Sequence, residues 1–280
     1  MKTRSICLFC LYLLFATTPL TLCAKEAADA TEDPVVIERQ KIVRALQQQT
    51  QAGNIKAQTD LGIAHLFGKV AELNYELALH FLSASAEKND PIAQTALGHM
   101  YSLGLGVKQN SATSIAWYEK AANQGHPIAQ SKLGFLYKQG KGVTQDYDKA
   151  LKWLRKAADH GDVYAQANLG LMYEKGLGTP QDYAEAARWY LIAAEQNHSN
   201  AQQQLASLYE KGLGVEKDYK KAYMWYSISA VWEDQALMTD DPRVRLSTLM
   251  KQQEIDAATE MATEYWMKHY KVADETQDLH

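Results

Sequence analysis

The chain has 280 residues, of which 46% are hydrophobic, and a formal net charge of −4 at pH 7. This apolar content is enough for a packed interior, whereas the acidic balance argues against binding to nucleic acids or to anionic membrane surfaces. After residue 24, no stretch approaches the roughly 18 apolar residues that a membrane-spanning helix needs.

Residues 1–24 have the features of a secretory signal peptide. Lys2 and Arg4 precede an apolar run over residues 6–15, which is too short to span a bilayer. Cleavage after Ala24 fits the usual length, and the Ala-Asp-Ala sequence at 28–30 offers a second possible site with small residues at the preferred positions. The sequence therefore predicts an exported protein, either periplasmic or secreted.

All three cysteines, Cys7, Cys10 and Cys23, lie within this predicted signal peptide. The mature protein would then form no disulfide and would offer no thiolate to a metal or to a nucleophilic reaction. The sequence leading to Cys23 resembles a bacterial lipoprotein processing site, in which case Cys23 would carry a lipid anchor. Leu22 stands where that site prefers a small residue, which favours an ordinary signal peptide.

The segment after the signal peptide is predicted to be a linker followed by a helix. Residues 25–33 are small, polar and acidic, as in a flexible linker. Pro34 then begins a pattern with Val36 and Val43 on one helical stripe. We expect residues 34–56 to form an N-terminal capping helix for the repeats that follow.

From residue 57 onward, Ala-Gln recurs every 36 residues, and each copy is followed three residues later by leucine. No insertion interrupts this spacing. It defines five repeats: 57–92, 93–128, 129–164, 165–200 and 201–236. A fixed period of this length indicates a solenoid, in which neighbouring repeats share a continuous core.

Each repeat shows the pattern of two helices joined by a turn. In the third repeat, Ala129 and Leu133 lie on one face of the first helix, and Ala150 and Trp153 lie on one face of the second. The turn between them contains Gly-Lys-Gly-Val at 140–143, where glycine permits a positive φ angle. The predicted fold class is therefore all-α.

An Asn or Asp precedes each predicted second helix, where its side chain can accept hydrogen bonds from free backbone N–H groups. These predicted N-cap residues are Asn74, Asn110, Asp146, Asp182 and Asp218. Glu185 follows Asp182 at the spacing of a capping box.

Gly98, Gly134 and Gly170 recur in the middle of the first helices. Glycine there is less favourable than alanine by about 1 kcal/mol. Its recurrence predicts that the paired helix of the same repeat approaches closely at this point.

The repeat pattern AQxxLGxxYxxGxGVxxDxxKAxxWYxKAA resembles the Sel1-like repeat family, a relative of the tetratricopeptide repeat. The third copy carries the pattern almost completely, from Ala129 to Ala158. The terminal copies depart most, with His65 and Phe81 in place of Tyr and Trp in the first repeat and Ala206 in place of Gly in the fifth. The resemblance implies a right-handed α/α superhelical solenoid with capping helices at both ends.

Beyond residue 230 the period is lost, and residues 237–271 are expected to form the C-terminal capping helix or helices. Asp241 followed by Pro242 is typical of a helix start. The apolar residues that follow allow one long helix or two shorter ones. Residues 272–280 are polar and are expected to fray.

Three patterns that could suggest chemistry have simpler structural interpretations. The Gly-x-Gly turns lack the third glycine and the preceding strand of a dinucleotide site. Ser85 and Lys88 have the Ser-x-x-Lys spacing of penicillin-interacting enzymes, but the companion motifs are missing and Ser85 occupies a position expected to be packed. His126, His160 and His198 recur near turns about 10 Å apart, too far for one metal ion. We expect no catalytic residue, cofactor or metal.

Aromatic residues also recur at the repeat period. The predicted core ladder consists of Trp117, Trp153, Trp189 and Trp225. For the neighbouring Tyr118, Tyr190 and Tyr226 the pattern allows either burial or partial exposure.

Positions of the first helices that differ between repeats are the candidates for partner binding. Two such positions, three residues apart, share a helical stripe and should align from one repeat to the next. The predicted binding residues are His99, Lys132, Phe135, Asn168, Leu171, Gln204 and Ser207. In a solenoid such a strip lines the concave face, although it can also be a solvated face without a ligand.

The family resemblance implies a non-catalytic scaffold of the bacterial cell envelope, or one exported to a host, that binds a protein or peptide partner. The alternative is an enzyme acting on β-lactams or cell-wall material, an activity associated with a cysteine-rich branch of the family. That branch is held together by disulfides between repeat helices. The absence of cysteine from the predicted mature chain favours the scaffold.

Overall fold

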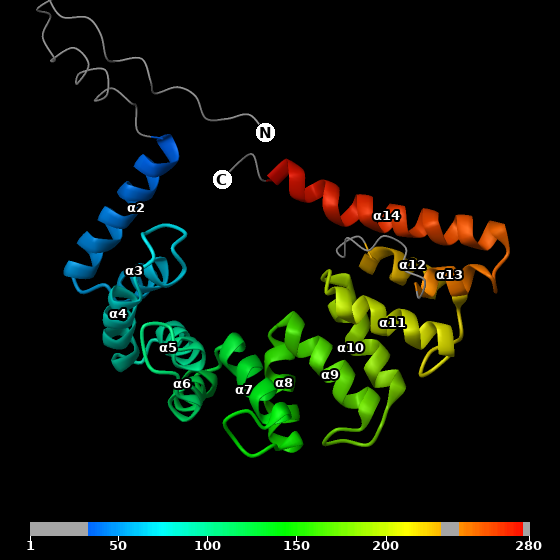
Figure 1. The fold of residues 1–280 in the computed structure, drawn as a ribbon, viewed down its shortest axis with the longest axis horizontal. Helices are drawn as coiled ribbons and strands as arrows, with labels where there is room; N and C mark the ends of the chain where they lie inside the picture. Colours follow the sequence, from blue (N-terminus) through cyan, green and yellow to red (C-terminus); the bar gives the residue numbers. More distant parts are fainter. Residues whose placement is uncertain (1–32, 231–240, 277–280) are drawn as a thin grey trace, which may run out of the picture.

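The computed structural model describes residues 33–230 and 241–276. The predicted signal peptide with Cys23, nearly all of the predicted linker and the end of the predicted tail lie outside these ranges. Within the described residues every regular element is a helix, and the helices follow one another in an arc with α2 and α14 at its ends (Figure 1). This is the predicted all-α solenoid. No helix in the described part of the chain has the length and apolar character required to span a bilayer.

The repeats alternate two kinds of helix between the terminal elements. The first helices are α3 Ile55–Phe67, α5 Pro91–Leu103, α7 Pro127–Gln139, α9 Val163–Lys175 and α11 Ser199–Lys211. The second helices are α4 Tyr75–Glu87, α6 Ser111–Asn123, α8 Tyr147–Asp159, α10 Tyr183–Glu195 and α12 Tyr219–Ala230. The terminal helices are α2 Pro34–Gln51, α13 Pro242–Ser247 and α14 Gln252–Thr276.

The predicted N-caps of the second helices are confirmed. The residues whose side chains accept a backbone N–H in the first turn are Asn74, Asn110, Asp146, Asp182 and Asp218. Each bond satisfies a donor that the helix itself leaves unpaired.

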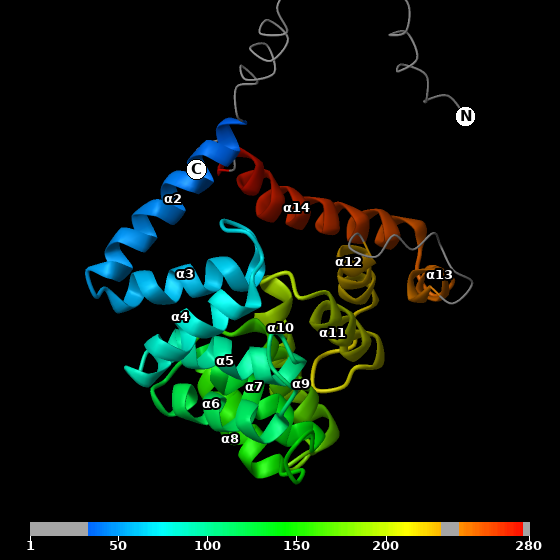
Figure 2. The same cartoon turned by 60° about the vertical axis from the view of Figure 1, so that its left-hand side comes forward.

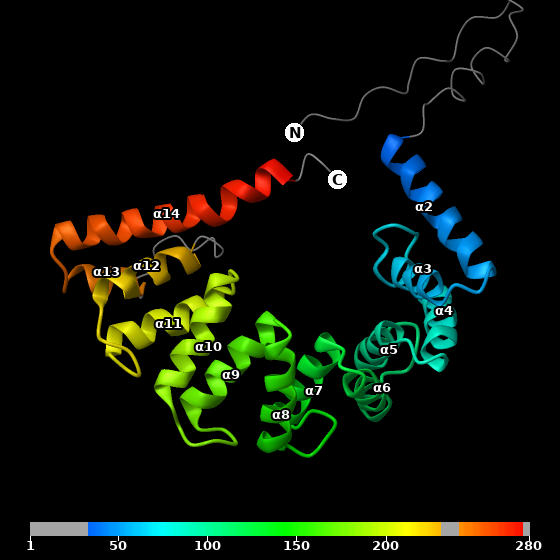
Figure 3. The ribbon, with the colours of Figure 1, turned by 180° about the vertical axis from the view of Figure 1, so that it is seen from behind.

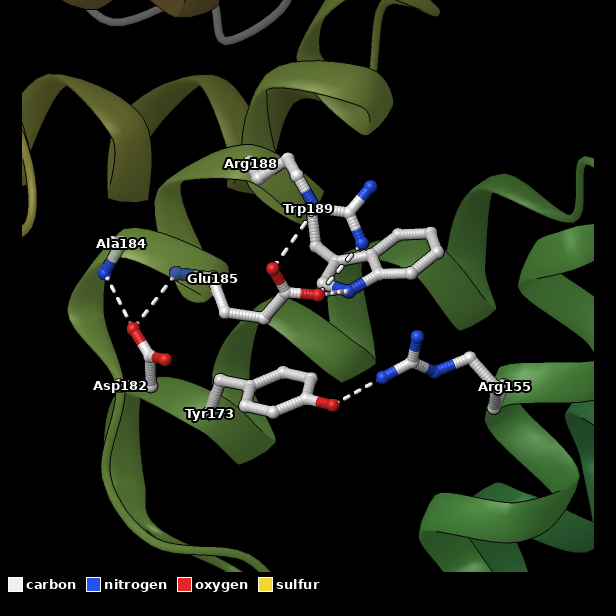
Figure 4. A network of polar contacts seen from close by, with 7 residues as sticks. All are labelled: Arg155, Tyr173, Asp182, Ala184, Glu185, Arg188 and Trp189. Atoms are coloured by element: carbon white, nitrogen blue, oxygen red, sulfur yellow. Dashed lines mark hydrogen bonds and ion pairs between the residues drawn. The ribbon is translucent and has the colours of Figure 1, made fainter.

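The predicted capping box at Asp182 is wrong. The carboxylate of Glu185 accepts hydrogen bonds from Arg188 and from Nε1 of Trp189 (Figure 4). The backbone N–H of Asp182, which the capping box would have used, donates instead to the carbonyl of Tyr173 at 2.9 Å. The N–H groups of Asn74, Asn110, Asp146 and Asp218 make the same bond to the carbonyl nine residues earlier, so this donor is not free for Glu185.

Each first helix ends at a glycine in the left-handed conformation, as Gly140 does at φ 67°. The second glycine of the turn, Gly142, also has a positive φ of 77° and lies against Ser111 at the start of the preceding second helix. The repeated Gly-x-Gly is thus a turn, as predicted, and its second glycine packs against the neighbouring repeat.

The mid-helix glycines lie against the second helix of their own repeat, which confirms the predicted close approach. A Cβ atom placed on Gly134 would lie 2.5 Å from Cγ of Leu154 and 3.1 Å from its backbone nitrogen. Gly98 and Gly170 face the rings of Tyr118 and Tyr190 in the same way.

The tryptophan ladder is only partly the core that the repeat spacing predicts. Trp189 and Trp225 are buried, but Trp117 and Trp153 are half-buried. Lysine ammonium groups lie over the two half-buried rings, that of Lys120 at 4.0 Å from the centre of Trp117. The expectation for this ladder was therefore wrong at Trp117 and Trp153.

The structure settles the burial of the adjacent tyrosines, which the sequence leaves open. Tyr118 and Tyr190 are 2% and 1% exposed, and only Tyr226 is half-buried. In repeats two to four the residue after the tryptophan packs against the helical glycine of its own repeat, whereas Trp117 and Trp153 contact clusters that include residues of the preceding repeat. In these three repeats burial is therefore greatest at the contact inside the repeat.

The glutamine of Ala-Gln connects successive helices. The buried Gln94, Gln130, Gln166 and Gln202 each donate from Nε2 to an alanine carbonyl eight residues earlier, near the end of the preceding second helix. Each bond pairs a buried Nε2 donor with a backbone carbonyl that would otherwise lack a partner at the end of the helix. This accounts for the recurrence of glutamine beside the small alanine.

The C-terminal capping region contains two helices rather than one. Asp241 accepts from the backbone N–H of Arg243 and caps α13, as predicted. Helix α14 packs against α12, and the hydroxyl of Tyr265 donates to the carbonyl of Ala194 at 3.2 Å. Figures 2 and 3 show α14 continuing past α12 across the open side of the arc, toward α2.

The first helices line the concave side of the solenoid. Besides contacting its own second helix, α3 contacts α5, α7 contacts α9, and α9 contacts α11. Helices on the inside of a curved stack lie closer together, and α3 and α5 are seen on the inner side of the arc in Figure 1. The first helices therefore lie toward the space that the arc encloses.

Candidate partner-binding face

The predicted binding residues all lie on first helices. They are His99 on α5, Lys132 and Phe135 on α7, Asn168 and Leu171 on α9, and Gln204 and Ser207 on α11. Lys132 and Phe135 are exposed, and the other five are half-buried. None of them belongs to the fully buried core, so all of them keep some surface available for contact.

Contacts between neighbouring helices link the predicted residues into one surface. The ring of His99 lies 6.3 Å from the ring of Phe67 on α3, measured between centroids. Burial and the charge of Lys132 on α7 both lower the pKa of His99. Leu171 packs against the core cluster that α11 helps to form. The row of residues is therefore continuous from α3 to α11.

The same face contains exposed apolar side chains that the sequence prediction missed. These additional residues are Phe67, Ile92, Leu103, Ile128 and Tyr164. Tyr164, Asn168 and Leu171 have the i, i+4, i+7 spacing of one helical stripe, so helical spacing alone could have added Tyr164. The sequence prediction took two positions from each first helix as binding residues. The exposed face continues about one helical turn before and after these positions.

We call the seven predicted and five additional residues the concave strip. Its N-terminal part, on α3, α5 and α7, is mainly apolar, and Phe67, Leu103 and Ile128 each keep more than half of their surface exposed. Its C-terminal part, on α11, contains the polar Gln204 and Ser207. The strip therefore changes character along the solenoid.

Lys138 lies beside the middle of the concave strip, between two repeats. Its Nζ is 5.5 Å from the ring centre of Phe135 and donates a hydrogen bond to Oδ1 of Asn168 on the next first helix. Nδ2 of Asn168 donates in turn to the carbonyl of Tyr164 at 2.7 Å, which fixes the orientation of the amide. Burial lowers the pKa of Lys138.

The residues considered for catalysis do not form a reactive arrangement. Ser85 is fully buried, and its Oγ has no hydrogen-bond partner among the described residues. Lys88 is exposed at the end of α4. A substrate cannot reach a hydroxyl in this position, so the Ser-x-x-Lys spacing reflects helix packing.

The histidines near the turns each have a separate role. Nδ1 of His126 lies 2.9 Å from the hydroxyl of Thr95, and Nδ1 of His198 accepts from the backbone N–H of Ala201 at 3.2 Å. Nδ1 of His160 donates to the carbonyl of Lys156 at 2.7 Å. In the described ranges no three His, Cys, Asp or Glu side chains come together as a metal site would require.

Helix pairs stacked in an arc at a 36-residue period define an α-solenoid repeat protein. The family model of the Sel1 repeat matches residues 55–90, 91–126, 127–162, 163–198 and 199–230. The chain belongs to the Sel1 repeat family. Repeat proteins of this fold are typically non-catalytic and bind other proteins.

Solved structures agree with this assignment. A Sel1 repeat protein from Oxalobacter formigenes is 31% identical, with a TM-score of 0.65 over 82% of this chain and 99% of that chain. A protective antigen of uropathogenic Escherichia coli strains, which displays an SLR fold, is 28% identical, with a TM-score of 0.55 over 85% of this chain and 59% of that chain. No curated protein matches the chain.

Proposed function

We propose that this protein is a non-catalytic scaffold that binds a protein or peptide partner through the concave strip. The observation that carries the proposal is the placement of exposed apolar surface. Within residues 55–230, large hydrophobic side chains are exposed at eight positions, and six of these belong to the strip, all except Leu73 and Leu77. Contiguous exposed apolar surface in a soluble domain is typical of an interaction site.

The location that we propose for this scaffold is the bacterial cell envelope or the exterior of the cell. The support is the sequence of residues 1–24, with its basic start and short apolar run. A periplasmic or secreted scaffold would expose the concave strip to partners outside the cytoplasm. Lipidation at Cys23 would additionally tether it to a membrane.

Site-specific photocrosslinking in cells tests the proposed face. A benzophenone amino acid placed at Phe135 should give a discrete crosslinked species that mass spectrometry can identify. The same probe at Leu77, an exposed apolar position outside the strip, is the matched control. Crosslinking from Leu77 but not from Phe135 would place the binding site elsewhere.

Combined substitution gives an independent test. Changing Lys132, Phe135, Asn168 and Leu171 together to alanine should abolish the crosslink from a strip position that is left unchanged, such as Ile128, without lowering the melting temperature appreciably. The Leu73→Ala/Leu77→Ala variant should keep it. Retention of the crosslink in the fourfold variant would contradict the proposal.

A further inference from the structure

One helix position next to the concave strip changes its chemistry between repeats. Repeats four and five have Glu174 and Glu210 there, and each carboxylate accepts from a tyrosine hydroxyl of its own second helix, Tyr190 at 2.8 Å and Tyr226 at 3.2 Å. Tyr190 therefore holds Glu174 inside its own repeat, whereas Glu210 also pairs with Arg245 of α13 at 2.8 Å. The equivalent position of the third repeat is Lys138.

The tyrosine that would hold this side chain is absent in the third repeat. Leu154 replaces it and packs against Gly134. Lys138 instead reaches the next repeat, where it bonds Oδ1 of Asn168. Where repeats four and five have a glutamate bonded to a tyrosine of the same repeat, repeat three has Lys138 and Leu154. The lysine therefore places a positive charge at the junction between two repeats.

The ammonium group of Lys138 lacks a counterion within the described chain. It has three donors, and the structure gives it one acceptor, the amide oxygen of Asn168. None of the ion pairs between described residues includes Lys138 or the exposed Lys132. A partly buried cation is normally paired with an acid, because an unpaired one loses hydration without compensation.

The surroundings of this cation are apolar. Phe135 lies beside it, and Ile128 and Tyr164 expose about half or more of their surface on the same face. Glu174, at the equivalent position of the next first helix, is already engaged by Lys175 at 2.8 Å and by Tyr190. A ligand that complements this part of the strip must supply both apolar side chains and a negative charge.

We propose that the partner binds as an acidic apolar segment, in which a carboxylate pairs with Lys138 while flanking apolar side chains contact Phe135, Ile128 and Tyr164. This inference rests on the proposed function, because it assigns chemistry to the same strip. The carboxylate would occupy the free donors of the ammonium group. Lys132 would add a second, exposed positive charge on the same helix.

Selection from a random 16-residue peptide library displayed on phage tests the chemistry without knowledge of the natural partner. The protein without residues 1–24 is the bait, and variants Lys138→Gln and Lys138→Glu are selected in parallel. Glutamate at this position already occurs in repeats four and five. Lys152→Gln on α8 removes the same charge from an exposed site outside the strip and is the control.

We expect peptides enriched by the wild type and by Lys152→Gln to combine apolar residues with Asp or Glu, and those enriched by Lys138→Glu to contain Lys or Arg instead. For one synthesised acidic binder, Glu→Gln should weaken Kd about tenfold against the wild type and have little effect against Lys138→Gln. Thermal melts of all variants verify folding.

Two outcomes separate the failure of this inference from the failure of the proposed function. Enriched peptides that lack acids but lose binding to a Phe135→Ser/Tyr164→Ser variant would overturn the acidic partner and leave the strip as the binding face. Enriched acidic peptides that bind the Lys138→Glu variant and the Phe135→Ser/Tyr164→Ser variant as tightly as they bind the wild type would overturn both proposals. Absence of any enriched peptide overturns the inference that a short acidic apolar segment suffices.

Discussion

The mid-helix glycine, whose side chain is a single hydrogen atom, allows the two helices of a repeat to approach closely. The glycine in the middle of the first helix places its Cα against the second helix, at Leu154 in the third repeat and at a tyrosine ring in the second and fourth. Tight contact at this point buries Leu154 completely. The helix-propensity cost of glycine, about 1 kcal/mol, is thus offset by packing that no larger residue allows.

This contact predicts that Gly134→Ala is destabilising although alanine is the better helix former. The added methyl group meets Cγ and the backbone nitrogen of Leu154, and a backbone atom cannot rotate away. Overpacking of this kind costs about 1–3 kcal/mol, more than the gain of about 1 kcal/mol in propensity. Urea denaturation should therefore show a lower midpoint.

The fifth repeat provides the matched control, because Ala206 stands there in place of glycine. Ala206 is buried in the core cluster of α11 and α12, so Ala206→Gly should be destabilising by more than about 1 kcal/mol, through helix propensity and the loss of a buried methyl group. If Gly134→Ala were to raise the urea midpoint, close packing would not be the reason for the recurrent glycine.

At the scale of the helices, the ends of the elements determine how repeats are joined. After the second helices α6 and α10, Gln124 and Gln196 donate from Nε2 to Oε1 of the buried Gln94 and Gln166, each at 2.7 Å. Oε1 of Gln94 and Oε1 of Gln166 therefore each have a hydrogen-bond donor. The equivalent residue after α8 is His160, and Oε1 of Gln130 has no hydrogen-bond partner among the described residues.

Replacing His160 by glutamine should therefore stabilise the array. The new amide can donate to Oε1 of Gln130 as Gln124 does to Gln94, and satisfying a buried acceptor contributes about 1 kcal/mol. The reverse change, Gln124→His, should lower stability by a similar amount because it leaves Oε1 of Gln94 unpaired. Differential scanning calorimetry of both variants measures the effect, and a neutral result for both would show that these bonds are energetically unimportant.

The sequence predicts the helices and the turns between them better than it predicts the burial of single side chains. Helix order, the N-caps such as Asp146 and the glycine turns such as Gly140 follow from residues close together in the chain, so a strict period reveals them. The burial of Trp117 is overestimated from the sequence, because it is the adjacent Tyr118 that packs against Gly98 inside the repeat. Similarly, the spacing predicts that Glu185 completes a capping box, whereas in the structure its carboxylate accepts hydrogen bonds from Arg188.

The candidate site was predictable only in part. Variation between repeats identified Phe135 and Asn168, but the same variation at Lys138 was not interpreted as part of the site. Its significance depends on the distance to the following repeat, on the loss of a tyrosine at Leu154 and on the orientation of the Asn168 amide. None of these three features is encoded by spacing within one helix.

At the scale of the whole molecule, the arc concentrates polar contacts between repeats at a few junctions. Nδ1 of His198 caps α11, and His126 bonds Thr95 of the preceding repeat, while the equivalent residues Asp90 and Asp162 use carboxylates at the same helix starts. Stability of a repeat array depends on each such interface. Protonation of His126 and His198 at two of these junctions should therefore change the stability of the entire solenoid.

The structure predicts lower stability below neutral pH. Burial lowers the pKa of both His126 and His198 from the ordinary value of 6.5. The unfolded chain then binds protons at a higher pH than the folded one, so this contribution to stability is complete above about 6.5 and is lost as pH falls below that value. Protonation of Nδ1 also removes the acceptor on which the cap of α11 depends. The melting temperature should thus be lower at pH 5 than at pH 7.5.

The His126→Asp/His198→Asp variant isolates the two junctions. Aspartate caps the equivalent helices, and Asp162 accepts both from the backbone N–H of Ala165 and from the hydroxyl of Ser131. A carboxylate stays charged over this pH window, so the variant should lose much of the pH dependence while keeping the fold. If the variant and the wild type lost the same number of degrees between pH 7.5 and pH 5, the destabilisation would originate outside the junctions.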